Sequence, residues 1–411
     1  MENSSHLLVF LIAIASLCST ITISFCNGTV NVFCKESERQ ALLGFKRDLK
    51  DPMNRLSSWK GSGDCCSWTG ISCDNLTGHV RELHFGNPFK TIFGIPDPFD
   101  IYPEEADWRY ALSGKINPSL LHLNYLNHLN LSYNDFEGIP IPSFIGSLKN
   151  LTYLDLSQAG FGGVIPYQLG NLSNLHYLNL LSNYPTMKVN NLQWVSSLVL
   201  LQFLDMSWVN LSKAYNWVDV LNMLPSLMEL RLSGCELGHS SPHLSMINFT
   251  SLAIFDVSDN ENFGLPRWLF SLTNLDSLYL SSTFLGGPIP YGLTSMTRLR
   301  ILDLSSNLLN STIPEWLCGF DRLESFDLSV NELKGTIPSA IGNFTSIISL
   351  NLEANQFEGK IDHLLRDLCR LRELWLGYNK FSGTMFESFE RFPCAANSLE
   401  QLWLSDNQLH D

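Results

Sequence analysis

Short leucine-rich segments recur along most of the chain, with polar residues between the leucines. The repeated string is LxxLxLxxN, for example LNHLNLSYN at 126–134 and LRILDLSSN at 299–307. Its last position recurs every 23 to 28 residues, at positions 134, 159, 183, 209, 235, 260, 283, 307, 331, 355, 379 and 407. With an irregular first copy near Asn87, this period predicts about thirteen turns of a solenoid.

The LxL part of each repeat explains why the pattern folds in this way. Side chains alternate along a strand, so both leucines point to the same side, and each turn adds one strand to a parallel sheet. The final Asn is expected to point inward and to hydrogen-bond to backbone groups that the bend leaves unpaired. Cys235 and Thr283 occupy the Asn position in two turns and can form some of these hydrogen bonds. Ala159 and Val209 cannot, so we expect distorted or hydrated turns there.

A second motif, LxGxIP, follows the Asn in many turns and leads into a short apolar segment such as GLTSM at 292–296. Gly permits a tight bend and Pro fixes φ, so we expect each repeat to close on the convex side. Segments 190–198 and 215–224 have helix-like apolar spacing instead, and their Trp194 and Trp217 are expected to fill the convex side. Segment 87–112, rich in Pro, acidic and aromatic residues, is expected to be a loop.

These patterns predict an α/β solenoid: a right-handed leucine-rich-repeat superhelix, or horseshoe, with a parallel β-sheet on its concave side. The open end of a solenoid needs a cover. We assign residues 27–78 to an N-terminal cap and residues 79–411 to about thirteen repeats, the last one incomplete. In the cap, Ser37-Glu38-Arg39-Gln40 fits a capping box. The helix that it opens should end at Asp51-Pro52, and its apolar face should consist of Ala41, Leu42, Phe45 and Leu49.

The first 26 residues are typical of a signal peptide. The apolar run from Leu7 to Leu17 is too short to span a bilayer comfortably, and a short membrane anchor is the alternative. Nine Asn-x-Ser/Thr triplets lie beyond the leader, which predicts passage through the secretory pathway. One is at Asn27, and the expected glycosylation sites are Asn75, Asn130, Asn150, Asn171, Asn210, Asn248, Asn310 and Asn343.

Composition narrows the classes of function. Hydrophobic residues make up 45% of the chain and charged residues 16%, which excludes a disordered chain. With a net charge of −14 and no basic stripe, nucleic acid is not an expected partner. The chain has no HExxH, GxSxG, phosphate-loop or dinucleotide-binding motif, so we expect no enzyme, cofactor or metal site. A column of aspartates could bind a cation, although a scaffold role is favoured: Asp155, Asp205, Asp256, Asp303 and Asp327.

The residues at the x positions of LxxLxLxxN should face solvent on the concave side, and several of them are large. Aromatic residues and Arg give a large contact area with few rotatable bonds, and aromatic faces suit sugar rings. We therefore predict that they contact an extracellular ligand; the alternative is that glycans or neighbouring rings cover them. One stretch holds Tyr153, His176, Tyr177, Trp208, Arg231 and Tyr279, and the far end holds Trp375, Tyr378 and Trp403.

The N-terminal region carries a specific resemblance. CKESERQALLGFKRDL at 34–49, LSSW at 56–59 and CCSWTGISC at 65–73 resemble the cap of plant extracellular leucine-rich-repeat proteins. NLTGHVRELHF at 75–85 and the irregular 190–224 region are similar to receptor-like proteins akin to fungal-xylanase receptors. The resemblance implies a disulfide-bonded cap with the pairs Cys34–Cys65 and Cys66–Cys73.

Besides Cys235, three further cysteines lie in the repeats. Cys369 and Cys394 follow the Asn positions of adjacent turns by 14 and 15 residues. Because adjacent turns lie about 5 Å apart, these two could form a disulfide. Cys318 ends a convex apolar segment and is expected to be buried rather than reactive.

The resemblance implies the ectodomain of a plant cell-surface receptor-like protein. Such a protein binds an extracellular peptide, protein or glycan ligand in defence or development. The chain has no kinase motif, so signalling would need a co-receptor kinase. The alternatives are a secreted polygalacturonase-inhibitor-like enzyme inhibitor, a soluble decoy, and a plain adhesion module. We expect the outer face of the plasma membrane if a membrane segment follows residue 411, and the apoplast otherwise.

Overall fold

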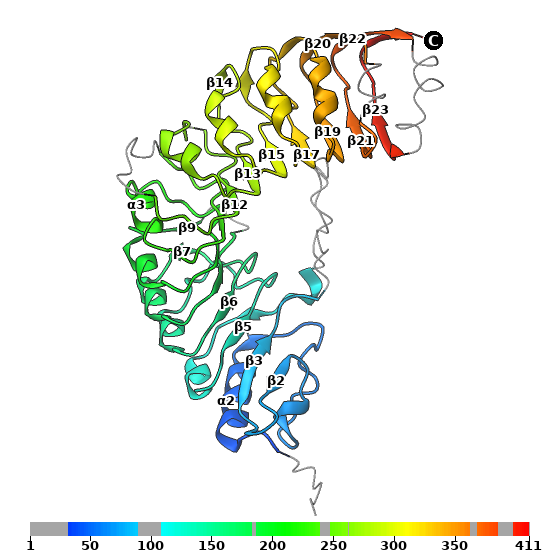
Figure 1. Cartoon of the computed structure of the whole chain (residues 1–411). Coiled ribbons are helices and arrows are strands. Elements are labelled where there is room, and N and C mark those ends of the chain that lie inside the picture. Colours follow the sequence, from blue (N-terminus) through cyan, green and yellow to red (C-terminus); the bar gives the residue numbers. More distant parts are fainter. Residues whose placement is uncertain are drawn as a thin grey trace, which may run out of the picture.

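The computed structural model describes residues 32–88, 108–182, 186–238, 247–261, 263–361, 368–384 and 398–410. In these residues, successive turns of the chain stack into a curved solenoid (Figure 1). Its strands form a fourteen-stranded sheet in which β2 pairs antiparallel with β3 and all later neighbours are parallel. The predicted solenoid with a parallel sheet is confirmed. The signal peptide, Asn27, Cys394 and most of the predicted loop 87–112 lie outside the described residues.

Each parallel strand of the main sheet comes from the LxL part of one turn. From β5 to β21 the central Leu or Phe is fully buried and forms the core, whereas its two neighbours face the concave side. Along the sheet, the strands are β2 (Ile71–Cys73), β3 (Val80–His84), β5 (His128–Asn130), β6 (Tyr153–Asp155), β8 (Tyr177–Asn179), β10 (Phe203–Asp205), β11 (Glu229–Arg231), β12 (Ile254–Asp256), β13 (Ser277–Tyr279), β15 (Ile301–Asp303), β17 (Ser325–Asp327), β19 (Ser349–Asn351), β21 (Glu373–Trp375) and β23 (Gln401–Trp403).

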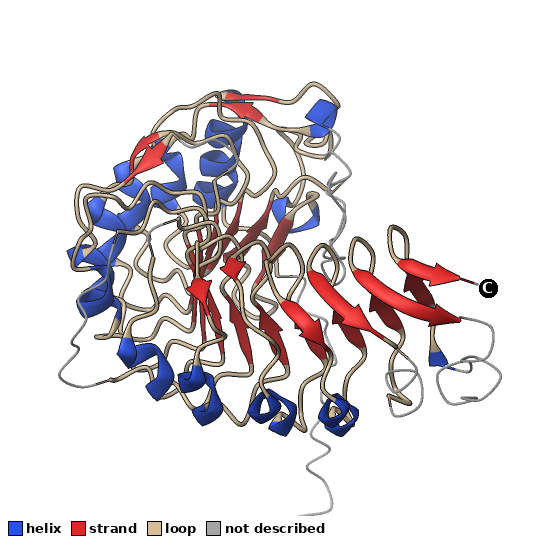
Figure 2. Cartoon of the chain, turned by 90° about the horizontal axis from the view of Figure 1, so that it is seen from above, coloured by secondary structure: helices blue, strands red, loops and turns tan. Residues whose placement is uncertain are grey.

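Short helices cover the convex side, outside the curve of strands (Figure 2). Many begin directly after an extended proline, which fixes φ without needing a hydrogen-bond donor. Trp194 and Trp217 are buried there, as predicted. No helix in the described ranges is long and apolar enough to cross a membrane. The convex helices are the 3-10 helices η3 (Pro118–His122), η4 (Ser143–Ser147), η5 (Tyr167–Asn171), η6 (Gln193–Ser197), η7 (Arg267–Ser271), η8 (Tyr291–Ser295), η9 (Glu315–Gly319) and η10 (Ser339–Asn343), and the α-helix α3 (Trp217–Leu221).

Several turns carry a second short strand between the Asn and the convex helix. The LxGxI motif predicts only a bend at this point, but backbone pairing extends across turns there. These strands form β7 (Gly163–Val164) with β9 (Met187–Lys188), β14 (Gly286–Gly287) with β16 (Leu308–Leu309), and the row β18 (Lys334–Thr336), β20 (Gln356–Gly359), β22 (Lys380–Thr384) and β24 (Gln408–His410).

The inward-pointing Asn ties neighbouring turns together. The side-chain amide of Asn307 donates to the carbonyl oxygens of Leu304 (3.0 Å) and Ser305 (2.9 Å) in its own turn. It also donates to Leu280 O in the preceding turn (2.8 Å), and its own oxygen accepts from Leu285 N (2.9 Å). The predicted role of this Asn is confirmed, since these buried backbone groups would be costly to leave unpaired. Asn260, Asn331, Asn355, Asn379 and Asn407 repeat the bond to the preceding turn.

The residue just before this position has a left-handed backbone in turn after turn. Such φ values are unfavourable for most L-residues, so the fold imposes them whatever the side chain. The turns at Ala159 and Val209 keep this geometry, and the distortion expected there is not found. With φ between +52° and +63°, the residues are Tyr133, Gln158, Trp208, Gly234, Asp259, Ser282, Ser306, Val330, Ala354, Tyr378 and Asp406.

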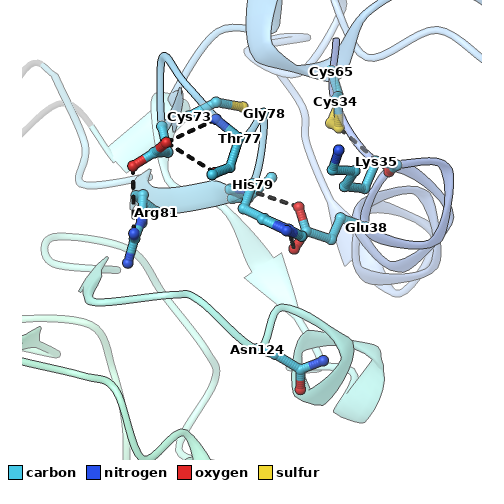
Figure 3. Close-up of polar contacts among 12 residues, drawn as sticks. Cys34, Lys35, Glu38, Cys65, Cys73, Thr77, Gly78, His79, Arg81 and Asn124 are labelled. Carbon is cyan, nitrogen blue, oxygen red and sulfur yellow. Dashed lines mark hydrogen bonds and ion pairs between the residues drawn. A yellow bond between two sulfur atoms is a disulfide. The ribbon is translucent and has the colours of Figure 1, made fainter. Parts of the chain in front are cut away.

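The cap is joined to the first parallel strand by a buried carboxylate (Figure 3). Glu38, on the cap helix, accepts a hydrogen bond from Val80 N (2.8 Å) and lies 2.9 Å from Nδ1 of His79. The disulfides Cys34–Cys65 and Cys66–Cys73 are present, as the resemblance implied. Through these contacts the cap covers the open end of the solenoid.

The cap helix, α2 (Glu36–Arg47), differs from its prediction in three details. It ends at Arg47, before Asp51-Pro52, and Leu49 lies beyond it in β1 (Leu49–Lys50), which pairs with β4 (Ser113–Gly114). The capping box is wrong, because Ser37 lies inside the helix and the Gln40 side chain donates to Glu36 Oε1 (2.8 Å). The rest of the apolar face is buried as predicted: Ala41, Leu42 and Phe45.

Candidate ligand-binding face

A row of stacked rings lies on the concave face near the N-terminal end, and we call it the ring ladder: His84, His128, Tyr153, Tyr177 and Phe203. The last four occupy the same strand position on β5, β6, β8 and β10 and pair in register. Ring centroids lie 4.5 Å apart for His84–His128, and 4.0, 4.2 and 4.1 Å apart along the rest. The parallel sheet therefore converts one position of the repeat into a continuous aromatic surface.

The rings of the ladder from His128 to Phe203 are half-buried. From His128 to Phe203 the planes of neighbouring rings differ by only 8° to 9°, so each ring face is covered by the next ring. The suggestion that aromatic faces could stack on sugars is therefore wrong for Tyr153 and Tyr177. What remains accessible is a row of ring edges and hydroxyl groups. Because the rings hold one another in place, little conformational entropy would be lost on binding.

The two tyrosines of the ladder keep their protons. Burial, with the nearby Asp155 carboxylate, raises the pKa of both Tyr153 and Tyr177 above the ordinary value. Tyr153 Oη lies 3.4 Å from Asp155 Oδ2, and Asn179 Nδ2 lies 3.4 Å from Tyr177 Oη. The ladder thus offers neutral hydroxyls that can donate or accept hydrogen bonds.

The other predicted residues of this stretch are spread beyond the ladder. His176 is half-buried, and its Nδ1 lies 2.8 Å from Asn174 O. Arg231 forms an ion pair with Glu229 at 2.6 Å. Tyr279 is half-buried, and burial raises its pKa. Trp208 is 46% exposed.

The three predicted residues at the far end do not form one exposed patch. Trp375 is only 7% exposed, which corrects the expectation that it faces a ligand. It is covered because Trp403 stacks on it, with ring centroids 5.0 Å apart. Trp403 and Tyr378 are 50% and 57% exposed and remain candidates.

Sequence reasoning missed His84, His128 and Phe203. The signal was present, because His128 and Phe203 occupy the same repeat position as Tyr153 and Tyr177. The row of rings is visible only when the turns are aligned and the residue at this one position is compared from turn to turn.

The column of aspartates serves the scaffold. Oδ1 of each Asp accepts the backbone N–H of the Ser two residues later, at 2.8 to 3.0 Å. Asn130, Asn179 and Asn351 accept the same bond in other turns. Burial raises the pKa of Asp205 to about 6. Burial and the neighbouring Asp327 raise the pKa of Asp303 to about 7.

The predicted glycosylation sites differ in accessibility. Asn130 and Asn210 are half-buried, and the side-chain oxygen of each accepts a local backbone N–H. Exposed positions favour attachment of a bulky glycan. The exposed asparagines are Asn75, Asn150, Asn171, Asn248, Asn310 and Asn343.

The cysteines in the repeats fall into two groups. Cys318 is buried, as predicted, and it is free; burial beside Glu315 raises its pKa to about 11. Cys235 is also buried and free. Cys369 is disulfide-bonded, and its proposed partner Cys394 lies outside the described residues.

Comparisons with known proteins agree with this geometry. Residues 35–74 match the leucine rich repeat N-terminal domain. The leucine rich repeat matches at 125–147, 150–172, 298–320, 322–344 and 370–392. Over 268 residues the chain is 40% identical to receptor-like protein EIX1 of Solanum lycopersicum, covering 62% of this chain and 25% of that protein. The chain thus has the cap and the repeats of a leucine-rich-repeat protein, and its sequence is similar to plant receptor-like proteins.

Receptor-like protein EIX2 of the same plant is 38% identical over 262 residues, covering 62% of this chain and 24% of that protein. The chain thus spans about a quarter of the length of both relatives. Its fold resembles the Arabidopsis receptor kinase HAESA, solved with the peptide hormone IDA and the co-receptor SERK1. The TM-score is 0.62 at 26% identity, covering 91% of this chain and 54% of that one. A TDR receptor gives 0.60 at 26% identity, covering 72% and 54%.

Proposed function

We propose that this chain is the ligand-binding part of a plant cell-surface receptor-like protein in defence or developmental signalling. The observation that carries the proposal is the ring ladder, an ordered surface on the open concave sheet. Large, rigid aromatic side chains are favoured contact residues in protein recognition. Because the ladder shows ring edges and hydroxyls, a peptide or protein ligand fits it better than a sugar ring.

Signalling would require a partner. The chain carries no kinase motif, so a co-receptor kinase would have to carry the signal inward. The HAESA complex, which contains the co-receptor SERK1, supports this arrangement by analogy. We place the chain on the extracellular side, as its disulfides and receptor-like relatives suggest. Membrane anchorage of the full-length protein is part of the same proposal.

The inhibitor alternative has less support. The relatives described above are receptor-like proteins. The aromatic ladder also gives no reason to expect that the target is an enzyme active site. Binding of a polypeptide to the concave face accounts for the ring ladder without assuming that the target is an enzyme.

A binding measurement tests the proposal. The chain, secreted from plant cells, is immobilised and titrated with fungal xylanase and with fractions of fungal culture filtrate. We expect saturable binding that Tyr177→Ala weakens at least tenfold by opening the ladder. Tyr167→Ala is the matched control, because Tyr167 is 72% exposed on the convex helix η5. Absence of saturable binding, or equal loss in both variants, would count against the proposal.

A further inference from the structure

Trp208 lies beside the ladder in a row with two other residues of adjacent turns. Trp208, Gly234 and Asp259 each lie five residues after in-register residues of β10, β11 and β12. The row is held by backbone hydrogen bonds from Trp208 N to Ser233 O (2.7 Å) and from Gly234 N to Ser258 O (2.9 Å). Adjacent turns are about 5 Å apart, so an indole starting at 208 reaches across 234 toward 259.

Gly234 is needed because of the indole rather than because of its backbone. Its φ of +63° is ordinary for this row, where other turns carry Gln158 or Ser282 with similar values. A Cβ at Gly234 would lie 2.7 Å from both Cδ2 and Cε3 of Trp208. The indole therefore rests directly on the glycine. We call Trp208, Gly234 and Asp259 the indole platform.

The platform offers a ring face, unlike the ladder. One side of the indole lies on Gly234, and Trp208 remains 46% exposed. The side chain at 208 is also held on a left-handed backbone, which restricts its directions. A flat aromatic face that is both fixed and open to solvent can accept a cation or a C–H surface.

Acidic side chains lie on the turns that carry the platform. Asp259 is exposed, and its Oδ2 accepts the hydroxyl hydrogen of Ser233 at 3.1 Å, which places the carboxylate beside Gly234. On the adjoining strands, Asp205 and Asp256 flank Arg231 in register. Arg231 is itself paired with Glu229 at 2.6 Å. The local balance is negative, as is the net charge of the whole chain, −14.

We propose that the indole platform binds a lysine or arginine side chain of the polypeptide ligand. The cation would lie on the open face of Trp208 and pair with the Asp259 carboxylate, as cation–π and ion-pair attraction both require. The inference rests on the proposed function, because it takes the concave face as the ligand-binding face. It adds the chemical class of one contact and its position.

The test uses a fluorescein-labelled peptide, GRGRGR-amide, and its citrulline counterpart, with the secreted chain. Fluorescence anisotropy should show saturable binding of the arginine peptide and at least tenfold weaker binding of the citrulline peptide. Trp208→Ala and Asp259→Asn should each weaken binding at least fivefold. Gly234→Ala should do the same, because it displaces the indole while keeping every charge.

Two variants outside the platform serve as matched controls. Asp406→Asn removes an exposed acid from the same left-handed position, and Trp108→Ala removes an exposed indole. Both should leave binding within twofold of wild type. If Asp406→Asn weakened peptide binding as much as Asp259→Asn does, the overall charge of the chain would explain the effect, and the inference would be overturned. Trp208-dependent binding of xylohexaose that ignores Asp259→Asn would overturn it too, since a glycan would then be the ligand.

Failure of the inference can be separated from failure of the proposed function. If Trp208→Ala leaves peptide binding unchanged while Tyr177→Ala still abolishes binding of the filtrate ligand, only the platform is refuted. If peptide binding depends on Trp208 but no filtrate ligand binds through the ladder, only the proposed function is refuted. Circular dichroism of each variant confirms that the solenoid has folded.

Discussion

Asp303→Asn should stabilise the protein at neutral and higher pH. Asp303 and Asp327 occupy the same strand position in adjacent turns and pair in register. Burial and the second carboxylate raise the pKa of Asp303 from 3.8 to about 7. The folded state therefore holds a proton that the unfolded chain releases above about pH 4, and folding becomes less favourable as pH rises from about 4 to 7.

The magnitude follows from the size of that shift. One pKa unit corresponds to about 1.4 kcal/mol, so a shift of about three units is equivalent to at most about 4 kcal/mol. Asparagine keeps the oxygen that accepts Ser305 N at 2.9 Å. The structure already uses Asn in this role at Asn130 and Asn351. We therefore expect a gain of about 2 to 4 kcal/mol at pH 8 and almost none at pH 4.

The reverse substitution provides the matched control. Asn351 Nδ2 donates to Asp327 Oδ2 at 2.9 Å. Asn351→Asp removes that bond and places another carboxylate beside Asp327, so it should destabilise the protein at pH 8 and much less at pH 4.

Urea unfolding followed by circular dichroism, from pH 4 to 8, measures the differences from wild type. Comparing differences cancels the contributions of groups that the substitutions leave alone. A gain from Asp303→Asn that does not grow with pH, or a loss at pH 8, would refute the reasoning. It would mean that the carboxylate is solvated in the folded state.

Three further predictions concern the scaffold. Reducing the cap disulfides, of which Cys34–Cys65 spans 31 residues, should destabilise the cap by about 3 to 4 kcal/mol; limited proteolysis should then cut α2 before the repeats, and cleavage in the repeats first would contradict this. Val330→Asn should raise the free energy of unfolding by about 1 kcal/mol, because a β-branched residue tolerates φ of +53° poorly; Val199→Asn, outside the left-handed row, should give no gain in the same urea titration. His128→Phe should gain about 1 kcal/mol, because Nε2 is buried without a hydrogen-bond partner within the described residues, while the stacking on Tyr153 is kept; lower stability in thermal unfolding would show that the nitrogen is satisfied.

The periodic part of the fold could be predicted from the sequence because period and burial are linked. A leucine at a fixed spacing must face the same interior in every turn, so the sheet and the Asn bonds follow from counting. The left-handed row could not be read in this way. Its occupants range from Val330 to Asp406 and share no chemistry, because the backbone rather than the side chain sets the angle.

The candidate site was only partly predictable for a different reason. Solvent-facing positions could be assigned from the repeat, and Tyr153, Tyr177 and Trp208 are half-buried or exposed, as that assignment requires. Whether a ring shows its face or its edge depends on the neighbouring turn, as the burial of Trp375 beneath Trp403 shows. Pairwise contacts between turns are not contained in the pattern of a single turn.

The spacing of the ring ladder bears on the curvature of the solenoid. Strand backbones in a sheet lie about 4.8 Å apart, whereas the ladder rings are 4.0 to 4.2 Å apart from His128 to Phe203. The row of rings on the concave side is thus shorter than the arc of the strand backbones, so the sheet curves toward the rings. Once the rings touch, these turns cannot bend further inward. The radius of this segment is therefore fixed before any ligand arrives, and a partner must match that curvature rather than induce it.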